Sequence, residues 1–198
     1  MPKITAGLFI SLDGVVAEPQ DWHFPYFNEE MGAAVGAQMS DTLLLGRATY
    51  DTFAEAWPPR EADGGPDAAI AKTFGDARKI VVSRQRLEFT WRNSEQLDGD
   101  LLEAVTALKQ EQSGSDIAIS GSVSVVRQLL AAGLIDELHL LVHPVALRAG
   151  ERLFDEGTPI PLALLSAQPF KTGVVHLVYG PAEAPTGDYE DAKEHLPQ

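Results

Sequence analysis

Cysteine is absent from this chain of 198 residues. Its absence excludes disulfides, thiolate nucleophiles and zinc sites built on cysteine. No segment approaches the roughly 18 consecutive apolar residues that a membrane-spanning helix requires. Residues 1–5 lead directly into a strand-like pattern, without the charged region, apolar core and cleavage site of a signal peptide. We therefore expect a cytoplasmic protein that does not associate with membranes.

Basic residues are also scarce, with 15 Lys and Arg against 29 Asp and Glu and a net charge of −14. Nucleic-acid binding needs a basic surface, so we expect no nucleic-acid partner. A phosphate-bearing ligand would have to be held by a few well-placed Arg or Lys side chains. His139 and His143 fall four residues apart in a strand pattern, where packing is the expected role. We therefore expect no metal site.

Buried strand patterns alternate with helix patterns over the first two thirds of the chain, which is typical of an α/β fold. After Gly133 only strand patterns follow, and a turn at 170–174 indicates an antiparallel hairpin. The expected domain covers 1–180, and the acidic, Pro-rich residues 181–198 read as a tail. The expected strands are 3–12, 42–46, 79–83, 89–91, 117–119, 136–142, 162–169 and 174–179. The expected helices are 28–39, 47–53, 67–74, 100–112 and one from 123 to Gly133, with a Pro- and Gly-rich loop at 57–66.

Three expected parallel strands end in residues suited to phosphate binding: Gly46-Arg47, Ser83-Arg84 and Gly121-Ser122. Ligands of such sheets bind at the carboxyl ends of the strands. Glycine lets the backbone approach a ligand, and the free N–H groups at a helix start attract phosphate. Ser120, Ser122 and Ser124 are also candidate caps of the helix that follows. Taken alone, the third segment fits an ordinary capped turn as well as a nucleotide site, but the three together indicate a phosphate-bearing cofactor.

The order and spacing of several segments resemble the dihydrofolate reductase superfamily. They are most similar to the C-terminal reductase domain of the riboflavin-biosynthesis deaminase-reductase and its free-standing relatives. The segments that carry the resemblance are 11–14 (Ser-Leu-Asp-Gly), 45–50 (Leu-Gly-Arg-Ala-Thr-Tyr), 79–84, 119–122 (Ile-Ser-Gly-Ser), 133–138, 143–145 (His-Pro-Val) and 150–154.

This resemblance implies a three-layer fold with a mixed, mostly parallel sheet of about eight strands and helices on both faces. It also implies NADPH as the cofactor and a homodimer. The implied cofactor-binding residues are Gly46, Arg47 and Thr49 at the pyrophosphate, Ser83 and Arg84 at the adenosine 2′-phosphate, and Gly121, Ser122 and Val123 at the phosphates. The chain departs from the family at Ser122, where dihydrofolate reductases have a second Gly, and at Arg148, where relatives tend to have Gly.

The expected function is reduction of a small heterocyclic or carbonyl substrate, in which the cofactor carries the difficult chemistry. Asp13, just after the first strand, is the candidate catalytic residue, as a proton relay or substrate anchor, although Asp-Gly is also a common turn. Trp22 and Phe24 are the candidate substrate-binding residues, since their rings could stack on a planar substrate. They could equally plug the start of the following helix.

The pyrimidine reduction step of riboflavin biosynthesis is one specific form of this function. The deaminase half of the bifunctional enzyme is excluded, because its zinc site needs cysteines. The alternative is a non-catalytic, NADP(H)-binding dimeric protein that keeps the fold without turnover. A hydrolase has little support, because the chain has no Gly-x-Ser-x-Gly segment and no Walker loop.

Overall fold

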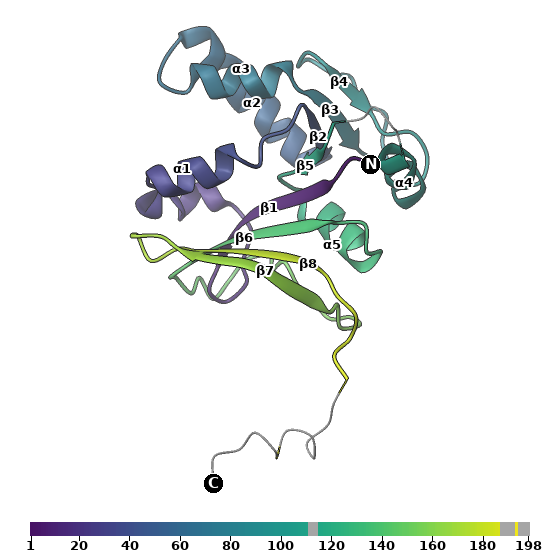
Figure 1. Cartoon of the computed structure of the whole chain (residues 1–198). Coiled ribbons are helices and arrows are strands. Elements are labelled where there is room, and N and C mark those ends of the chain that lie inside the picture. The colour runs from purple at the N-terminus through teal and green to yellow at the C-terminus, as the bar shows by residue number, and fades with distance from the viewer. Residues whose placement is uncertain (111–114, 187–192, 194–198) are drawn as a thin grey trace.

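The computed structural model describes residues 1–110, 115–186 and 193, and it contains one eight-stranded sheet between layers of helices (Figure 1). The strand order is β4-β3-β2-β5-β1-β6-β8-β7. The strands are β1 Ile4–Ser11, β2 Thr42–Gly46, β3 Arg78–Val82, β4 Ser94–Gln96, β5 Ile117–Ile119, β6 Glu137–His143, β7 Leu162–Pro169 and β8 Val175–Pro181. Neighbours from β4 to β6 pair in parallel, and β8 is antiparallel to both β6 and β7. The predicted α/β fold, with a mostly parallel sheet and a C-terminal antiparallel hairpin, is confirmed.

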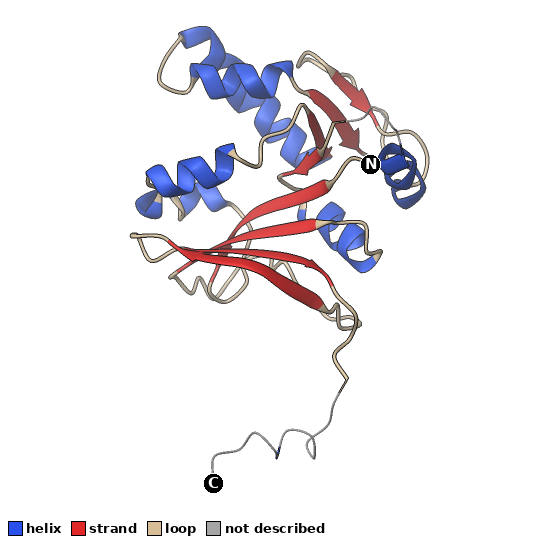
Figure 2. Cartoon of the chain, in the orientation of Figure 1, coloured by secondary structure: helices blue, strands red, loops and turns tan. Residues whose placement is uncertain are grey.

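Helices cover both faces of the sheet (Figure 2). They are α1 Glu29–Gly36, α2 Arg47–Asp63, α3 Ala68–Asp76, α4 Leu101–Gln110 and α5 Val123–Ala131, together with the short 3₁₀ helices η1 Pro19–Asp21 and η2 Phe24–Tyr26. Helices α1, α2 and α3 lie on one face, and α4 and α5 lie on the other (Figure 1). The strand at the centre of this arrangement is β1, which pairs with β5 and β6.

The core follows from the two-residue period of the strands. Ile4, Ala6, Leu8 and Ile10 alternate along β1 and are buried against the α4–α5 side, where helix α5 contributes Val126 and its neighbours. A second cluster on the other face holds residues of β2 and β3 against α2 and α3. Burial of these apolar side chains is the main term that stabilises the fold.

Helix α2 is longer than the sequence indicates. It continues through Pro58 and Pro59 to Asp63, whereas we predicted a helix that ended at Phe53 and a loop over 57–66. Proline removes backbone donors and normally ends a helix. Here Trp57 packs against Phe74 of α3 at a ring distance of 4.7 Å, and this contact holds the turn that carries the prolines. Tertiary packing therefore overrides the local preference.

The predicted strand at 89–91 is also wrong. The edge strand β4 lies at Ser94–Gln96, after a turn in which Asn93 has a φ of 57°. Trp91 is buried in the cluster between the sheet and the helices. The apolar residues at 89–91 therefore pack in the core and do not pair as a strand. The helix that we predicted at 28–39 is shorter in the structure, where α1 ends at Gly36. Helix α4 ends at Gln110, and the predicted continuation to Gln112 lies outside the described residues, as do 187–192 and 194–198 of the predicted tail.

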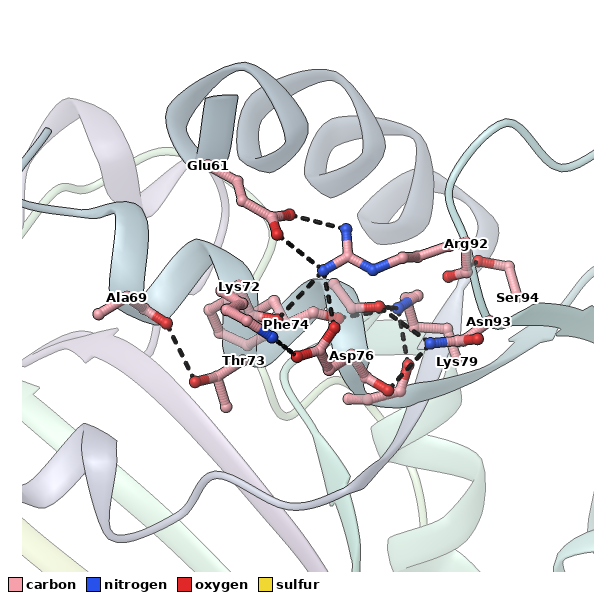
Figure 3. A network of polar contacts seen from close by, with 12 residues as sticks. Glu61, Ala69, Lys72, Thr73, Phe74, Asp76, Lys79, Arg92, Asn93 and Ser94 are labelled. Carbon is pink, nitrogen blue, oxygen red and sulfur yellow. Dashed lines mark hydrogen bonds and ion pairs between the residues drawn. The ribbon is translucent and has the colours of Figure 1, made fainter. Parts of the chain in front are cut away.

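A network of polar contacts joins α2, α3 and the start of β3 (Figure 3). Lys79 is fully buried, and its ammonium group donates to the backbone carbonyls of Phe74, Gly75 and Ala77 at 2.7–2.9 Å. The same ammonium lies 4.2 Å from the ring centroid of Trp91, a cation–π contact. Lys79 thus satisfies carbonyls at the end of α3, where the helix dipole favours a cation. The network ties the end of α3 to the start of β3.

Candidate functional site

The carboxyl ends of β3, β2 and β5 lie side by side, because these strands are parallel neighbours in the sheet. Gly46 ends β2, Ser83 follows β3, and Gly121 follows β5 after one intervening residue. The three segments that we predicted from the sequence to bind phosphate therefore share one rim of the molecule. Parallel α/β sheets bind their ligands at this rim.

The β2 and β5 ends touch through glycine backbone. Gly46 N–H donates to the Gly121 carbonyl at 3.2 Å. A Cβ on Gly46 would lie 2.1 Å from Ser122 Oγ, and a Cβ on Gly121 would lie 2.7 Å from Thr49 Oγ1. Gly121 also has a φ of 134°, and its peptide bond to Ser122 is cis. No side chain fits at either position, because the two turns approach too closely.

Helices α2 and α5 begin at this junction, and their N-cap residues, Gly46 and Ser122, make no side-chain capping bond. Ser122 occupies the N-cap position of α5, as expected, but its hydroxyl makes no capping bond and instead lies 3.3 Å from Thr49 Oγ1. The predicted capping role of Ser122 is therefore wrong. Val123, the first residue of α5, is half-buried beside it. Two positive helix ends converge here, which suits a group carrying negative charge.

Arg47 connects this junction to the end of β3. Its guanidinium donates to Gln85 Oε1 at 2.6 Å and to Asp51 Oδ2 at 3.3 Å. Ser83 fixes Gln85, since its hydroxyl donates to the Gln85 carbonyl at 2.9 Å and accepts from the Gln85 N–H at 3.1 Å. Arg84 is exposed and makes no hydrogen bond or ion pair with the described part of the chain. Its guanidinium is thus available to a ligand.

Asp13 lies further along the same rim, after β1. Its carboxylate accepts from Ser11 Oγ at 2.7 Å and from the backbone N–H groups of Leu147 and Arg148 at 3.0 and 2.8 Å. The Ser11 hydroxyl and these N–H groups lower the pKa of Asp13 to about 2. The side chain is therefore ionised at neutral pH and anchors the loop after β6. An ionised carboxylate has no proton to give, so this geometry does not favour proton donation, and the role of Asp13 as a substrate anchor stays a prediction.

Arg148, the position at which the resemblance implies Gly, has a φ of 67°. This left-handed conformation is one that glycine adopts without cost. The hydrogen bond from the Arg148 N–H to Asp13 holds the residue there, and its side chain is exposed. The backbone of the loop is thus one that glycine could also adopt.

The aromatic residues after β1 form a group with two histidines. Trp22 donates its indole N–H to the Ala17 carbonyl at 3.0 Å and lies edge-on to His143, with ring centroids 5.0 Å apart. Phe24 is 63% exposed and lies over His23, with centroids 4.1 Å apart. His143 ends β6 and pairs in register with Ser11 at the end of β1. The group therefore sits at the carboxyl ends of β1 and β6.

We did not predict His23 or His143 as site residues. The sequence offered only a weak signal for them, since His143 falls in an apolar strand pattern and His23 among aromatics. Both are buried, at 6% and 0% exposure. Burial lowers the pKa of His23 to about 4 and also lowers the pKa of His143. Both imidazoles are therefore neutral at pH 7.

A cavity of about 220 Å³ lies at another place, where α5 ends and β6 begins. Its lining is largely apolar and includes Leu130, Ile135, Leu138, Ile160 and Tyr179. None of the predicted site residues lines it. Across residues 1–110, 115–186 and 193, no three His, Asp or Glu side chains gather as a metal site would require, and no helix is long and apolar enough to cross a bilayer.

Comparisons with known proteins agree with this fold. The chain is 30% identical over 181 residues to the Bacillus subtilis protein YyaP. This match covers 89% of this chain and 94% of YyaP. It is 29% identical over 168 residues to YwjB of the same organism, covering 79% of this chain and 84% of YwjB.

Solved structures at low identity share the architecture. A putative riboflavin biosynthesis protein from Shewanella sp. PV-4 superposes with a TM-score of 0.69 at 20% identity, over 92% of this chain and all of that one (100%). A pyrimidine reductase-like protein from Corynebacterium diphtheriae superposes with a TM-score of 0.62 at 16% identity, over 92% of this chain and 93% of that one. RibD from Acinetobacter baumannii superposes with a TM-score of 0.65 at 18% identity, over 92% of this chain and 58% of the longer RibD chain.

Residues 2–176 match the family described as the RibD C-terminal domain, and this match takes in the rim glycines, both arginines and the aromatic group. The chain therefore belongs to the RibD C-terminal domain family.

Proposed function

We propose that this protein is an NADPH-dependent reductase that transfers a hydride to a small heterocyclic or carbonyl substrate. The observation that carries the proposal is the junction of Gly46 and Gly121, where two uncapped helix starts converge beside Arg47. A pyrophosphate is the ligand that such a junction suits, because N–H groups and a guanidinium surround it in a protein that is otherwise acidic.

The residues present fit the cofactor. In this proposal Gly121, Ser122 and Val123 offer backbone N–H groups to the phosphates, with Gly46, Arg47 and Thr49 beside them. Ser83 and Arg84 hold the adenosine 2′-phosphate. When bound, the dihydronicotinamide supplies the hydride. The part of this chain is to hold and orient the cofactor, and to keep water from the reacting atoms.

The family and its neighbours support a pyrimidine as the substrate. The match is to the RibD C-terminal domain, and one structural neighbour is described as pyrimidine reductase-like. We therefore propose the pyrimidine reduction step of riboflavin biosynthesis, carried out by a homodimer. We propose that these 198 residues take no part in the deamination step, since they contain no cysteine for a deaminase zinc site.

Arg84→Ala tests the cofactor assignment. If Arg84 holds the 2′-phosphate, the Kd for NADPH should rise at least about tenfold, which is the effect of one lost charge-assisted contact. The Kd for NADH, which lacks that phosphate, should hardly change. The matched control is Arg86→Ala, an exposed arginine two residues further on, and fluorescence titration measures both cofactors. Equal loss for NADPH and NADH would refute the assignment.

The alternative is an NADP(H)-binding protein without turnover. The state of Asp13 favours it, because this carboxylate is ionised and already hydrogen-bonded. Oxidation of NADPH with a panel of pyrimidine and carbonyl substrates separates the two functions. Tight NADPH binding with no oxidation across the panel would support the alternative.

A further inference from the structure

The loop after β3, residues 83–87, is held in shape by two side chains. The Ser83 hydroxyl donates to the Gln85 carbonyl and accepts from the Gln85 N–H. Gln96 lies on the edge strand β4, next to β3 (Figure 1). Its amide nitrogen donates to the Ser83 and Gln85 carbonyls at 3.1 and 2.9 Å, and its amide oxygen accepts from the Leu87 N–H at 3.1 Å. Only one orientation of the amide satisfies all three contacts, because carbonyls accept and N–H groups donate.

Gln85 connects this loop to helix α2. Its backbone N–H and carbonyl are both engaged within the loop, while its side-chain Oε1 accepts from Arg47 Nη1 at 2.6 Å. Arg47 directly follows β2, and β2 and β3 are parallel neighbours with Gly46 opposite Val82. The Gln85 side chain therefore spans the rim between the carboxyl ends of these two strands.

The Arg47 guanidinium is held from two edges. Gln85 accepts from Nη1, and Asp51, one turn further along α2, accepts from Nε at 3.3 Å. A guanidinium carries five N–H donors in one plane, so these two contacts fix the plane and leave three N–H groups for a ligand. The Arg47 side chain is 46% exposed, and a side chain of this length samples many rotamers when nothing holds it.

The partner that Gln85 offers to Arg47 is uncharged. Asp51 already offsets part of the positive charge of the guanidinium, and a second carboxylate would repel a phosphate group. An amide oxygen orients the guanidinium without adding negative charge. The contact therefore keeps a directed positive charge at the rim of a protein whose net charge is −14.

We propose that Gln85 is a positioning residue for Arg47, and that Gln96 presets the loop from which Gln85 acts. The inference rests on the proposed function, in which Arg47 lies at the cofactor pyrophosphate. Gln85 does not touch the cofactor in this proposal. It lowers the entropy that Arg47 loses when the pyrophosphate binds, because the guanidinium is already aligned.

A double-mutant cycle on the full chain tests the proposal. Gln85→Leu removes the amide oxygen, and we expect the Kd values for NADPH and for NADH to rise equally, by about three- to tenfold, since both cofactors carry the pyrophosphate. Arg47→Ala should raise both Kd values at least about tenfold. Adding Gln85→Leu to Arg47→Ala should cause no further loss, because Gln85 then has no side chain to position.

The cycle separates positioning from a general structural role. A structural role of Gln85 would weaken binding in the Arg47→Ala protein as well. The matched control is Gln128→Leu, an exposed glutamine whose amide nitrogen donates to the Ser124 carbonyl of its own helix at 2.9 Å, and it should bind both cofactors like the wild type. Fluorescence titration measures every Kd, and thermal unfolding checks that each variant is folded.

Gln96→Leu is the second variant, and it changes a residue that makes no contact with Arg47. It releases the loop from β4, so the Kd values for both cofactors should rise about threefold or more. The rise should be larger for NADPH, because Arg84, assigned to the 2′-phosphate, lies in the same loop. Wild-type affinities in this variant would overturn the part assigned to Gln96.

Three outcomes of the cycle would overturn the role of Gln85. They are unchanged affinities in Gln85→Leu, a loss confined to NADPH, and an equal loss with and without Arg47. In each case the wild type still binds the cofactors, and the reductase proposal stands. Failure of the wild type to bind either NADPH or NADH would instead reject the reductase proposal itself, so the two failures are distinguishable.

Discussion

Two buried polar groups in this protein have opposite hydrogen-bonding states. The Lys79 ammonium is fully buried and donates to three backbone carbonyls, 2.7–2.9 Å away (Figure 3). The His143 ring is just as buried, yet its Nε2 has no partner in the described part of the chain. A satisfied buried group stabilises the fold, whereas an unsatisfied one costs stability until something binds to it. The difference separates a buried group whose hydrogen bonds the fold supplies from one that the described residues leave without a partner.

Lys79→Met should produce the largest loss of stability. The methionine fills a similar volume, but it removes the ammonium that donates to three buried carbonyls, of which Gly75 keeps a second donor in Asn93 at 3.3 Å, and it removes the cation–π contact with Trp91. We expect the free energy of unfolding to fall by about 4 kcal/mol. Urea unfolding measures it, and Lys72→Met, which alters an exposed lysine paired with Asp76, is the control. If Lys79→Met were as stable as the control, Lys79 would not have the structural role assigned to it.

Acid should destabilise the protein through His23. Its pKa is 6.5 in the unfolded chain and about 4 in the folded one, so between these values the unfolded state binds more protons. Stability due to this group is therefore complete above pH 6.5 and is lost as the pH falls toward 4, by at most about 3 kcal/mol.

His23→Phe keeps the stack on Phe9 and removes the titrating group, so it should flatten the stability curve between pH 6.5 and 4. The free energy of unfolding of both proteins, measured over this range, checks the prediction. Because other groups titrate in both proteins, the contribution of His23 is the difference between the two curves of unfolding free energy against pH. Curves of the same shape would show that the pKa of His23 does not change on folding.

Arg92→Gln should have the smallest effect. Arg92 bridges Glu61 of α2 and Asp76 of α3 at 2.7–2.9 Å, but its side chain is 41% exposed. Solvent and salt screen such pairs, so we expect a loss well below that of Lys79→Met. The loss should shrink further at roughly 1 M salt, where the Debye length is about 3 Å. Thermal unfolding at low and high salt measures it, and a loss that does not depend on salt would point to packing instead of charge.

Strong local patterns made much of the fold predictable. The central strand Thr42–Gly46 and the edge strand Leu162–Pro169 have the predicted bounds. Continuous apolar runs and turn residues mark such segments whatever lies around them. The helical conformation of Pro58 and Pro59 was not predicted, because it does not follow from the local sequence. Their helical conformation depends on the packing of Trp57 against Phe74, and no local signal reports a contact between two helices.

The rim residues show the same division. Gly46, Gly121 and Arg47 were predicted as neighbours because parallel strands share one edge, and the structure brings them together. The hydrogen bonds of Asp13 to Leu147 and Arg148 join residues more than 130 positions apart. No spacing rule reaches that far, so the ionised, anchoring state of this carboxylate could not be read from the sequence.

The sequence by itself determined the α/β class, the hairpin at the C-terminus and the segments that meet at the rim. These features follow from hydrophobic periodicity and turn chemistry, which act over a few residues. The tertiary structure alone decided which buried polar groups are satisfied. Lys79 and His143 look alike in sequence, as polar residues next to a short apolar run, 80–82 in the first case and 140–142 in the second. In the assembled fold, three backbone carbonyls accept from the Lys79 ammonium, whereas no donor among the described residues reaches His143 Nε2. Hydrogen-bond partners are set by positions in space, so the sequence alone does not give this difference.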